Sequence, residues 1–250
     1  MNIDISLITT FHHEGTLAHI TLNSIERCRR FAEKNGIRCE YVWVLDNADE
    51  ETVRVLDNYP VDKGLVRMLN VDCRDAGKSR NEGIAAASAD TIAIFDGDDL
   101  YSENWIERSV HYLKKYGDNV ILHPEYMVTF DQIRCFGRQT DQTEDKFSAD
   151  GLLTSNYWTS AWTIARKSVY QKVPYVGTHV NETGFAFEDW HWNCETIAAG
   201  FVHRLTPETV GFYRRRQGSR IMSETSANGI MRPSGIFSKD FNGAGDAISA

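Results

Sequence analysis

The sequence predicts an α/β fold with a mostly parallel sheet covered by helices on both faces. Three observations support it. Apolar segments alternate with segments of helical periodicity over residues 4–117. The strand-like segments are apolar on both faces, which is typical of parallel sheets. The 250 residues, 42% of them hydrophobic, are enough to bury the core of one such domain.

Four strands and four helices are expected in this first part. The strands are expected at residues 4–11, 39–45, 64–71 and 90–95. Helices are expected at residues 17–35, 49–59 and 77–89, followed by a fourth up to Gly117. The first helix has apolar residues at helical spacing, and Gly36 can close it. The second starts with acidic residues, which favour a helix N-terminus, and Ser102 is expected to cap the fourth.

The sequence after residue 118 is less regular. One or two strands are expected at 119–130, and further strands at 159–165, 201–205 and 209–215. A helix is expected at 187–200, while the polar residues 137–156 are expected to form a loop. Residues 223–250 contain few large apolar side chains and are expected to form a polar C-terminal tail or lid. A single compact domain over residues 1–222 is therefore predicted.

Composition and charge exclude several classes of function. The net charge of −8 disfavours non-specific nucleic-acid binding. The first ten residues include Asp4 and no basic segment, so a signal peptide is not expected. No apolar run reaches the roughly 18 residues that span a membrane. The five scattered cysteines fit reduced thiols in a cytosolic protein, and a structural zinc site is not expected.

Three carboxylates directly follow the strand expected at 90–95. Asp96, Asp98 and Asp99 fall within four positions and repel one another unless a positive charge compensates them. Ligands bind at the carboxyl ends of parallel strands, where the first two strands place Thr10 and Asp46. Mg²⁺ or Mn²⁺ suits such hard oxygen ligands, and magnesium commonly binds one or two carboxylates together with substrate phosphates. A divalent cation site is predicted here, and the pattern leaves open which of the three aspartates bind the cation.

Several segments, taken in order, resemble glycosyltransferase family 2, whose members have the GT-A fold. The closest match is "RDAGKSRNEGIAAASADTIAIFDGDDL", which ends in a D-x-D motif. "SLITTFHHEGTL" and "VWVLDNADEETVRVL" are similar to the family's first two strand regions, and "FEDWHW" to its E-D motif. "GFYRRRQGSRIM" resembles the segment that closes over the donor phosphates. The order and spacing of these motifs make the resemblance, over roughly residues 3–222, fairly specific.

The resemblance implies a metal-dependent transferase that uses a nucleotide-sugar. Residues from about 1 to 100 are then the nucleotide-sugar-binding half, and residues from about 101 to 222 are the acceptor-binding and catalytic half. The metal ligands are drawn from Asp98, Asp96 and Asp99, with Asp98 favoured, and Asp46 is the expected contact to uracil. The expected nucleotide-sugar contacts are Thr10, Phe11, Glu14, Asp46, Arg80, Asp96, Gly97 and Arg216.

The E-D motif supplies the catalytic residues that the resemblance implies. Asp189 is expected to be the base toward the acceptor hydroxyl, with Glu188 beside it contacting the acceptor. One base without a separate nucleophile implies a single displacement with inversion at the anomeric carbon. Trp158 and Trp190 are the expected acceptor-stacking residues, because aromatic faces suit sugar rings. The expected donor is a UDP-sugar, and the expected acceptor is a glycan or lipid-linked sugar met in the cytoplasm, with any membrane contact peripheral.

The sequence departs from the family pattern at two places. Arginines such as Arg216 stand in the closing segment where a metal-binding His is common, and Asn47 stands where a second Asp is usual. These departures leave open a non-catalytic, sugar-nucleotide-binding scaffold domain of a larger synthase. A second alternative is a phosphohydrolase like the haloacid dehalogenases, which also place D-x-D after a buried strand. That class needs Thr or a similar residue after the motif, where this chain has Leu100.

Overall fold

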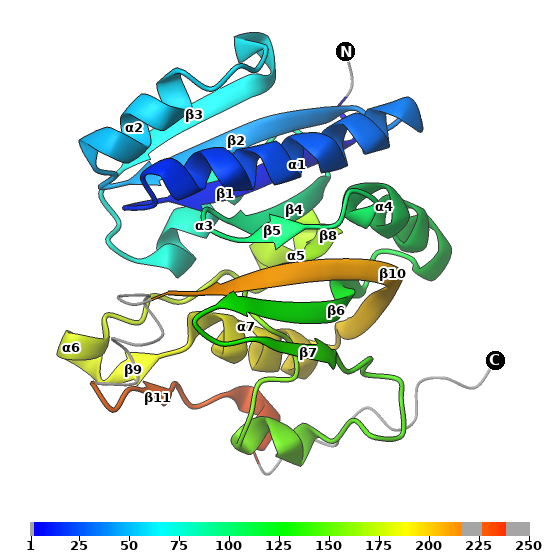
Figure 1. The fold of residues 1–250 in the computed structure, drawn as a ribbon. Helices are drawn as coiled ribbons and strands as arrows, with labels where there is room; N and C mark the ends of the chain where they lie inside the picture. The colour runs from blue at the N-terminus through cyan, green and yellow to red at the C-terminus, as the bar shows by residue number, and fades with distance from the viewer. Residues whose placement is uncertain (1–2, 217–226, 239–250) are drawn as a thin grey trace.

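Four parallel strands form the amino-terminal half of one large sheet. The structure, a computed structural model, describes residues 3–216 and 227–238 (Figure 1). In spatial order the four strands are β3 (Val66–Val71), β2 (Cys39–Asp46), β1 (Ile5–Phe11) and β4 (Thr91–Asp96). The chain returns between them through α1 (Thr16–Lys34), α2 (Glu50–Asp57), the short η1 (Lys63–Leu65) and α3 (Ala76–Ala86). The strands and helices predicted for this part are confirmed, with small differences at their ends.

Alternate side chains of these strands pack on helices on opposite faces of the sheet. Leu7 of β1 lies in one buried cluster with Leu22 and Ile25 of α1. Its neighbour Ile8 lies in a second cluster with Ile84 of α3. Successive residues of a strand point to opposite faces, and burial of each such side chain contributes about 1.5–3 kcal/mol. Both faces of β1, β2 and β4 are therefore apolar, whereas the edge strand β3 exposes Arg67 and Asn70.

The remaining strands extend the sheet in mixed directions. Beyond β4 the strands follow in the order β8 (Ile164–Arg166), β6 (Val120–Asp131), β10 (Val202–Arg215) and β5 (Leu100–Tyr101). The strand β7 (Cys135–Arg138) also pairs with β6. The helices of this half are α4 (Trp105–Tyr116), η2 (Ala149–Leu153), α5 (Lys167–Lys172), α6 (Val180–Thr183) and α7 (Glu188–Ala198). The long pairings of the sheet, including β6 with β10, are parallel, and the short ones are antiparallel. The predicted fold class is confirmed.

The structure corrects two predicted strands. Residues 201–205 and 209–215 were expected to be separate strands, but most of both segments belongs to β10, because pairing with β6 continues across a bulge between Thr206 and Val210. Residues 159–165 are extended only toward their end, in β8. Ser160 has a φ of +59°, which lies outside the extended region and breaks the strand.

Ser102 does not cap the fourth helix, contrary to the prediction. The N-cap position of α4 is Asn104. The Ser102 hydroxyl instead accepts a hydrogen bond of 3.0 Å from the backbone N–H of Val210. A hydroxyl near a helix start can bond either the helix or a neighbouring strand, and here the strand β10 lies within reach.

Residues 227–238 lie against α7. β11 (Ile230–Met231) pairs with β9 (Phe185–Ala186), and η3 (Gly235–Phe237) packs on α7, where Ile236 is buried. The rest of the predicted tail or lid, residues 223–226 and 239–250, lies outside the described residues. Within the described ranges, no helix is both long and apolar enough to cross a membrane.

Candidate functional site

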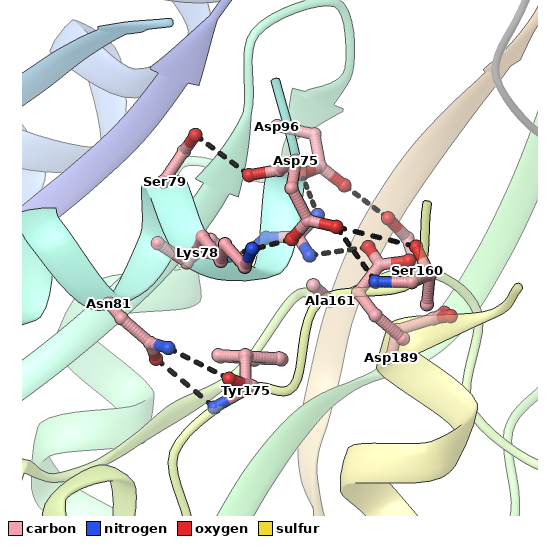
Figure 2. A network of polar contacts seen from close by, with 12 residues as sticks. Asp75, Lys78, Ser79, Asn81, Asp96, Ser160, Ala161, Tyr175 and Asp189 are labelled. Atoms are coloured by element: carbon pink, nitrogen blue, oxygen red, sulfur yellow. Dashed lines mark hydrogen bonds and ion pairs between the residues drawn. The ribbon is translucent and has the colours of Figure 1, made fainter. Parts of the chain in front are cut away.

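The carboxyl ends of neighbouring strands meet at one edge of the sheet. Thr10 at the end of β1 is the register partner of Asp96 at the end of β4. On the other side of β1, strand β2 ends at Asp46. The start of α7 brings Glu188 and Asp189 to the same region from the second half of the chain (Figure 2). The convergence predicted from a parallel sheet is therefore observed.

Arg80 of α3 bonds two of these carboxylates at once. Its Nη2 donates to Oδ1 of Asp96 at 2.8 Å, and its Nη1 donates to Oε1 of Glu188 at 2.6 Å. The Ser160 hydroxyl donates to the other oxygen of Asp96 (Figure 2). The guanidinium also lies over the ring of Tyr175, and only 5% of the Arg80 side chain is exposed. Arg80 thus links the two halves of the fold, while its contact to a nucleotide stays a prediction.

Asp98 is paired with an arginine at the surface. Oδ2 of Asp98 accepts a hydrogen bond of 3.0 Å from Nε of Arg216, and the two side chains are 22% and 31% exposed. Burial raises the pKa of Asp98 and the negative charge of Asp96 adds to the rise, while Arg216 opposes it. A carboxylate in such a setting is stabilised by a positive charge beside it.

Asp99 has an internal role. Its side chain is fully buried, with Oδ1 accepting from the backbone N–H of Arg214 at 2.7 Å and Oδ2 from Nε1 of Trp162 at 2.9 Å. Burial and the neighbouring negative charges of Asp98 and Asp96 hold its pKa well above the usual range. Asp99 joins the D-x-D segment to β10 and exposes no surface to a cation. Metal binding by Asp96 and Asp98 stays a prediction, and the enclosed Asp99 is not accessible to a cation.

Gly97 allows two backbone segments to touch. A Cβ at this position would lie 2.6 Å from the carbonyl oxygen of Thr10 and 2.7 Å from Cδ1 of Phe11. Phe11 is itself buried and packs edge-on against Trp43. Gly97 therefore lets the D-x-D segment lie directly against the end of β1. The predicted contacts of Gly97 and Phe11 to a nucleotide-sugar stay untested.

Asp46 organises the loop that leads into α3. Its carboxylate accepts hydrogen bonds from the Ser79 hydroxyl at 2.7 Å and from the backbone N–H groups of Cys73, Arg74 and Asp75 at 2.8–3.1 Å. Burial alone raises the pKa of Asp46, but these donors outweigh it and hold the pKa below its ordinary value. The carboxylate is thus already bonded within the protein.

Asn47, the next residue, is exposed and has a φ of +49°. Its amide donates to the carboxylate of Asp72. Asn47 is therefore the polar side chain exposed to solvent directly after β2. It stands where the family usually has a second Asp.

Glu14 lies close to the D-x-D segment. It is half-buried, and its carboxylate accepts from the backbone N–H of His12. Burial raises the pKa of Glu14 to about 7; the charge of Asp98 contributes to the rise, and Arg216 opposes it. Glu14 is therefore a carboxyl group that changes charge near neutral pH beside Asp98.

The two acidic residues of the E-D motif have different surroundings. Glu188 is 1% exposed and faces Arg80. Asp189 is half-buried in the first turn of α7, and its Oδ2 accepts from Nδ2 of Asn156 at 3.4 Å. The helix dipole favours an ionised carboxylate at this position. Of the pair, Asp189 is therefore the more exposed, and its role as a base stays a prediction.

The tryptophans divide into core and partly exposed residues. Trp158 is fully buried, stacks on His203 with ring centroids 4.2 Å apart, and donates from Nε1 to the Thr140 carbonyl oxygen. Its ring has no face available to an acceptor, so the predicted stacking role of Trp158 is corrected to a core role. Trp190 is half-buried, and its Nε1 donates to the Leu152 carbonyl oxygen at 3.0 Å.

Some residues at the site carried no recognisable signal in the sequence. Ser160 bonds Asp96 from a left-handed backbone conformation, and Tyr175 and Asn156 reach the site from irregular segments. Residues 217–222 of the predicted closing segment lie outside the described residues. Within the described ranges, no three His, Cys, Asp or Glu side chains are grouped as metal ligands.

Comparison with known proteins decides the family. Residues 6–171, more than half of the chain, match the family model described as Glycosyl transferase family 2. The chain belongs to this family. Comparison with curated proteins finds no sequence match.

Solved structures agree with the family in fold. S. aureus TarS 1-349 in complex with UDP-GlcNAc superposes with a TM-score of 0.68 at 16% identity, over 88% of this chain and 61% of that one. The complex of the same protein with UDP gives a TM-score of 0.64 at 14% identity, over 85% of this chain and 61% of that one. At these identities the likeness shows the fold alone, and it confirms the GT-A fold. The chain spans about three fifths of the length of these structures.

Proposed function

We propose that this protein is an inverting, metal-dependent glycosyltransferase that moves a sugar from a UDP-sugar to a hydroxyl of a glycan or lipid-linked acceptor. The observation that carries the proposal is the shared position of the D-x-D carboxylates and Asp189. Arg80 bonds Asp96 on one side and Glu188, the neighbour of Asp189, on the other. This arrangement supports a donor site and a base at the same edge of the sheet, as transfer between two bound substrates requires.

The choice of a UDP-sugar donor rests on similarity. The structures described above contain UDP-GlcNAc and UDP. In this chain the sheet edge at the D-x-D segment also carries Thr10 and Asn47, and Glu14 interacts electrostatically with Asp98. Asn47 is the side chain we favour for the pyrimidine, because it is exposed, with its amide bonded only to the exposed Asp72 side chain and to Asp46 among the described residues. Asp46 is buried, and its oxygens accept from Ser79 and from the backbone N–H groups of residues 73–75.

The residues at the D-x-D segment fit a divalent cation. Asp96 and Asp98 offer hard carboxylate oxygens, and the paired Arg216 guanidinium shows that Asp98 accommodates a positive charge. Two carboxylates are the usual protein share of a magnesium site that also uses substrate phosphates. A cation bound there would neutralise charge that develops on the leaving diphosphate. Asp99 takes no part in this proposal, because it is enclosed.

Asp189 would take the proton of the acceptor hydroxyl as that oxygen attacks the anomeric carbon. General-base catalysis of this kind contributes roughly 10²–10⁴-fold. Trp190, one residue further along α7, is the aromatic side chain we propose for acceptor binding. We further propose that the acceptor is met in the cytoplasm, which the five cysteines without disulfides support.

A ligand panel followed by a transfer assay tests the proposal. Thermal unfolding is measured with UDP-, GDP-, CMP- and dTDP-sugars, each with and without Mn²⁺. A rise with UDP-sugars that needs Mn²⁺ is expected, because a ligand that binds only the folded state stabilises it. Release of UDP is then expected to fall at least about 100-fold in Asp189→Asn, with donor binding unchanged. Donor binding without any turnover would favour the scaffold alternative, and no response to any nucleotide would contradict the proposal.

A further inference from the structure

The Asp98–Arg216 ion pair differs from the other contacts of the D-x-D segment in its exposure. Nε of Arg216 lies 3.0 Å from Oδ2 of Asp98, and both side chains reach the surface. Asp96, in contrast, is bonded through both oxygens, to Arg80 and Ser160. Asp99 is enclosed, so an incoming cation cannot reach it. Of the three aspartates, Asp98 is therefore the one whose partner, Arg216, an incoming cation can displace with the smallest loss of internal bonds.

Arg214 and Arg216 hold the D-x-D segment in different ways. The backbone N–H of Arg214 donates to Asp99, its Nε to the carbonyl oxygen of Asp98 and its Nη1 to Asp131, and its side chain is 8% exposed. Arg216 contacts the segment through Nε alone, as far as the described residues show. Arg214 therefore fixes the segment, and Arg216 can leave without disrupting it.

The carboxyl groups of Asp96 and Glu14 interact electrostatically with Asp98. Burial raises the pKa of both Glu14 and Asp98, and their negative neighbours raise it further. The positive charge of Arg216 opposes the rise in both groups. Removal of Arg216 without a replacement would take from Asp98 the guanidinium that pairs with it, whereas Asp96 would keep its bond to Arg80.

We propose that Arg216 is the resident cation of Asp98 in the donor-free protein, and that it gives way to the divalent cation of the donor and moves onto the donor diphosphate. This inference rests on the proposed function. A guanidinium keeps its charge at all relevant pH values, so it is repelled by a divalent cation on the same carboxylate. The diphosphate offers the paired oxygens that arginine binds in bidentate geometry. Arg216 thereby weakens the binding of the metal in the absence of donor, and strengthens the binding of the donor once the metal is bound.

Two binding measurements on Arg216→Gln test this exchange. Binding of Mn²⁺ alone is followed by electron paramagnetic resonance of free Mn²⁺, and binding of UDP at saturating Mn²⁺ by calorimetry. We expect Arg216→Gln to bind Mn²⁺ alone about 10-fold more tightly than the native protein, and UDP about 10-fold more weakly. Arg215→Gln is the matched control, because it removes the same charge one position away, where the guanidinium lies over Tyr213. Its two affinities are expected to change less than about 3-fold.

The opposite signs distinguish exchange from a simple loss of charge or of folding. Weaker or unchanged Mn²⁺ binding in Arg216→Gln, with a native unfolding midpoint, overturns the proposal. Equal gains in both variants overturn it as well, because they indicate a general effect of net charge. If Mn²⁺ binds native protein and variant alike, the exchange fails while the proposed metal dependence stands. If Mn²⁺ binds neither protein, even with UDP present, both fail.

Discussion

Arg80 and Glu188 lie 108 positions apart in the sequence and form an ion pair of 2.6 Å beneath the candidate site. Their side chains are 5% and 1% exposed, so the pair is removed from water. A buried ion pair contributes little net stability compared with apolar residues, but the loss of one partner leaves an uncompensated charge. The main role of the pair is therefore to position the start of α7 relative to α3.

Substitution of Arg80 should lower the stability of the protein, and a second substitution at Glu188 should restore part of it. Arg80→Met removes the guanidinium that neutralises Glu188 and Asp96, and is expected to lower the free energy of unfolding by about 3–5 kcal/mol. The double variant with Glu188→Met is expected to recover part of that loss. Urea unfolding of both variants measures the difference. Arg30→Met, on an arginine that is 66% exposed, is the control and should cost less than about 1 kcal/mol. A similarly small effect of Arg80→Met would contradict the bridging role.

Gly97 is expected to be intolerant of a single methyl group. In Gly97→Ala the new Cβ would meet the Thr10 carbonyl oxygen at 2.6 Å and Phe11 at 2.7 Å, so β1 or the D-x-D segment must shift. Such overpacking costs about 1–3 kcal/mol. Gly137→Ala is the matched control, because nothing lies within 4 Å of its added Cβ, and its stability should change by less than about 0.5 kcal/mol. Thermal unfolding compares the two variants, and equal midpoints would refute the steric explanation.

The residues at the sheet edge could be predicted from the sequence, because local features of the chain determine where each strand ends. Apolar runs and helical spacing determine β1 to β4, and parallel pairing then brings Thr10 next to Asp96. The same signals do not show where a side chain points within a turn. Asp98 and Asp99 are identical and adjacent, yet one reaches the surface and the other is enclosed.

Long-range contacts limited the rest of the site prediction. Arg80 was expected to meet a nucleotide, and its internal bonds depend on Glu188, which no local pattern connects to it. Trp158 and Trp190 were both expected to stack on the acceptor, but Trp158 is enclosed and stacked on His203. The family resemblance named segments that converge at this sheet edge, but it did not separate side chains that reach the surface from those that hold a segment in place.

Glu14 is expected to make the protein less stable at higher pH. Its pKa is raised from 4.5 to about 7 by burial, with a contribution from Asp98, while Arg216 opposes the rise. The folded protein therefore holds a proton on Glu14 that the unfolded chain has lost, and the resulting stabilisation disappears as the pH rises through about 7. Glu14→Gln should raise the unfolding midpoint relative to the native protein at pH 8 and change it little at pH 5.

Exposed Glu51 provides the control for this measurement. Glu51→Gln removes the same charge from α2 and should leave the pH dependence of unfolding unchanged. If Glu14→Gln shifts the midpoint equally at pH 5 and pH 8, the effect comes from packing, and the raised pKa is not its cause.

A buried histidine pair should have the opposite pH dependence. His123 and His203 are fully buried, with Nε2 of His123 2.8 Å from Nδ1 of His203 and Nε2 of His203 2.8 Å from the Thr196 hydroxyl. Burial lowers the pKa of His123 to about 3, although Asp141 opposes the shift, and burial together with His123 lowers the pKa of His203 well below its usual value. Both rings stay neutral in the folded state while the unfolded chain takes up protons below its ordinary pKa of about 6.5.

The free energy of unfolding is therefore expected to fall as the pH drops from about 6.5 toward 4. Each proton taken up only by the unfolded chain contributes about 1.4 kcal/mol per pH unit to that slope. Replacement of both histidines by Gln should reduce this slope by up to the contribution of about two protons, each about 1.4 kcal/mol per pH unit. The variant is also expected to be less stable at every pH. His111→Gln, on a side chain that is 64% exposed, should leave the slope unchanged. An unchanged slope in the double variant would mean that these rings titrate in the folded protein, in conflict with their burial.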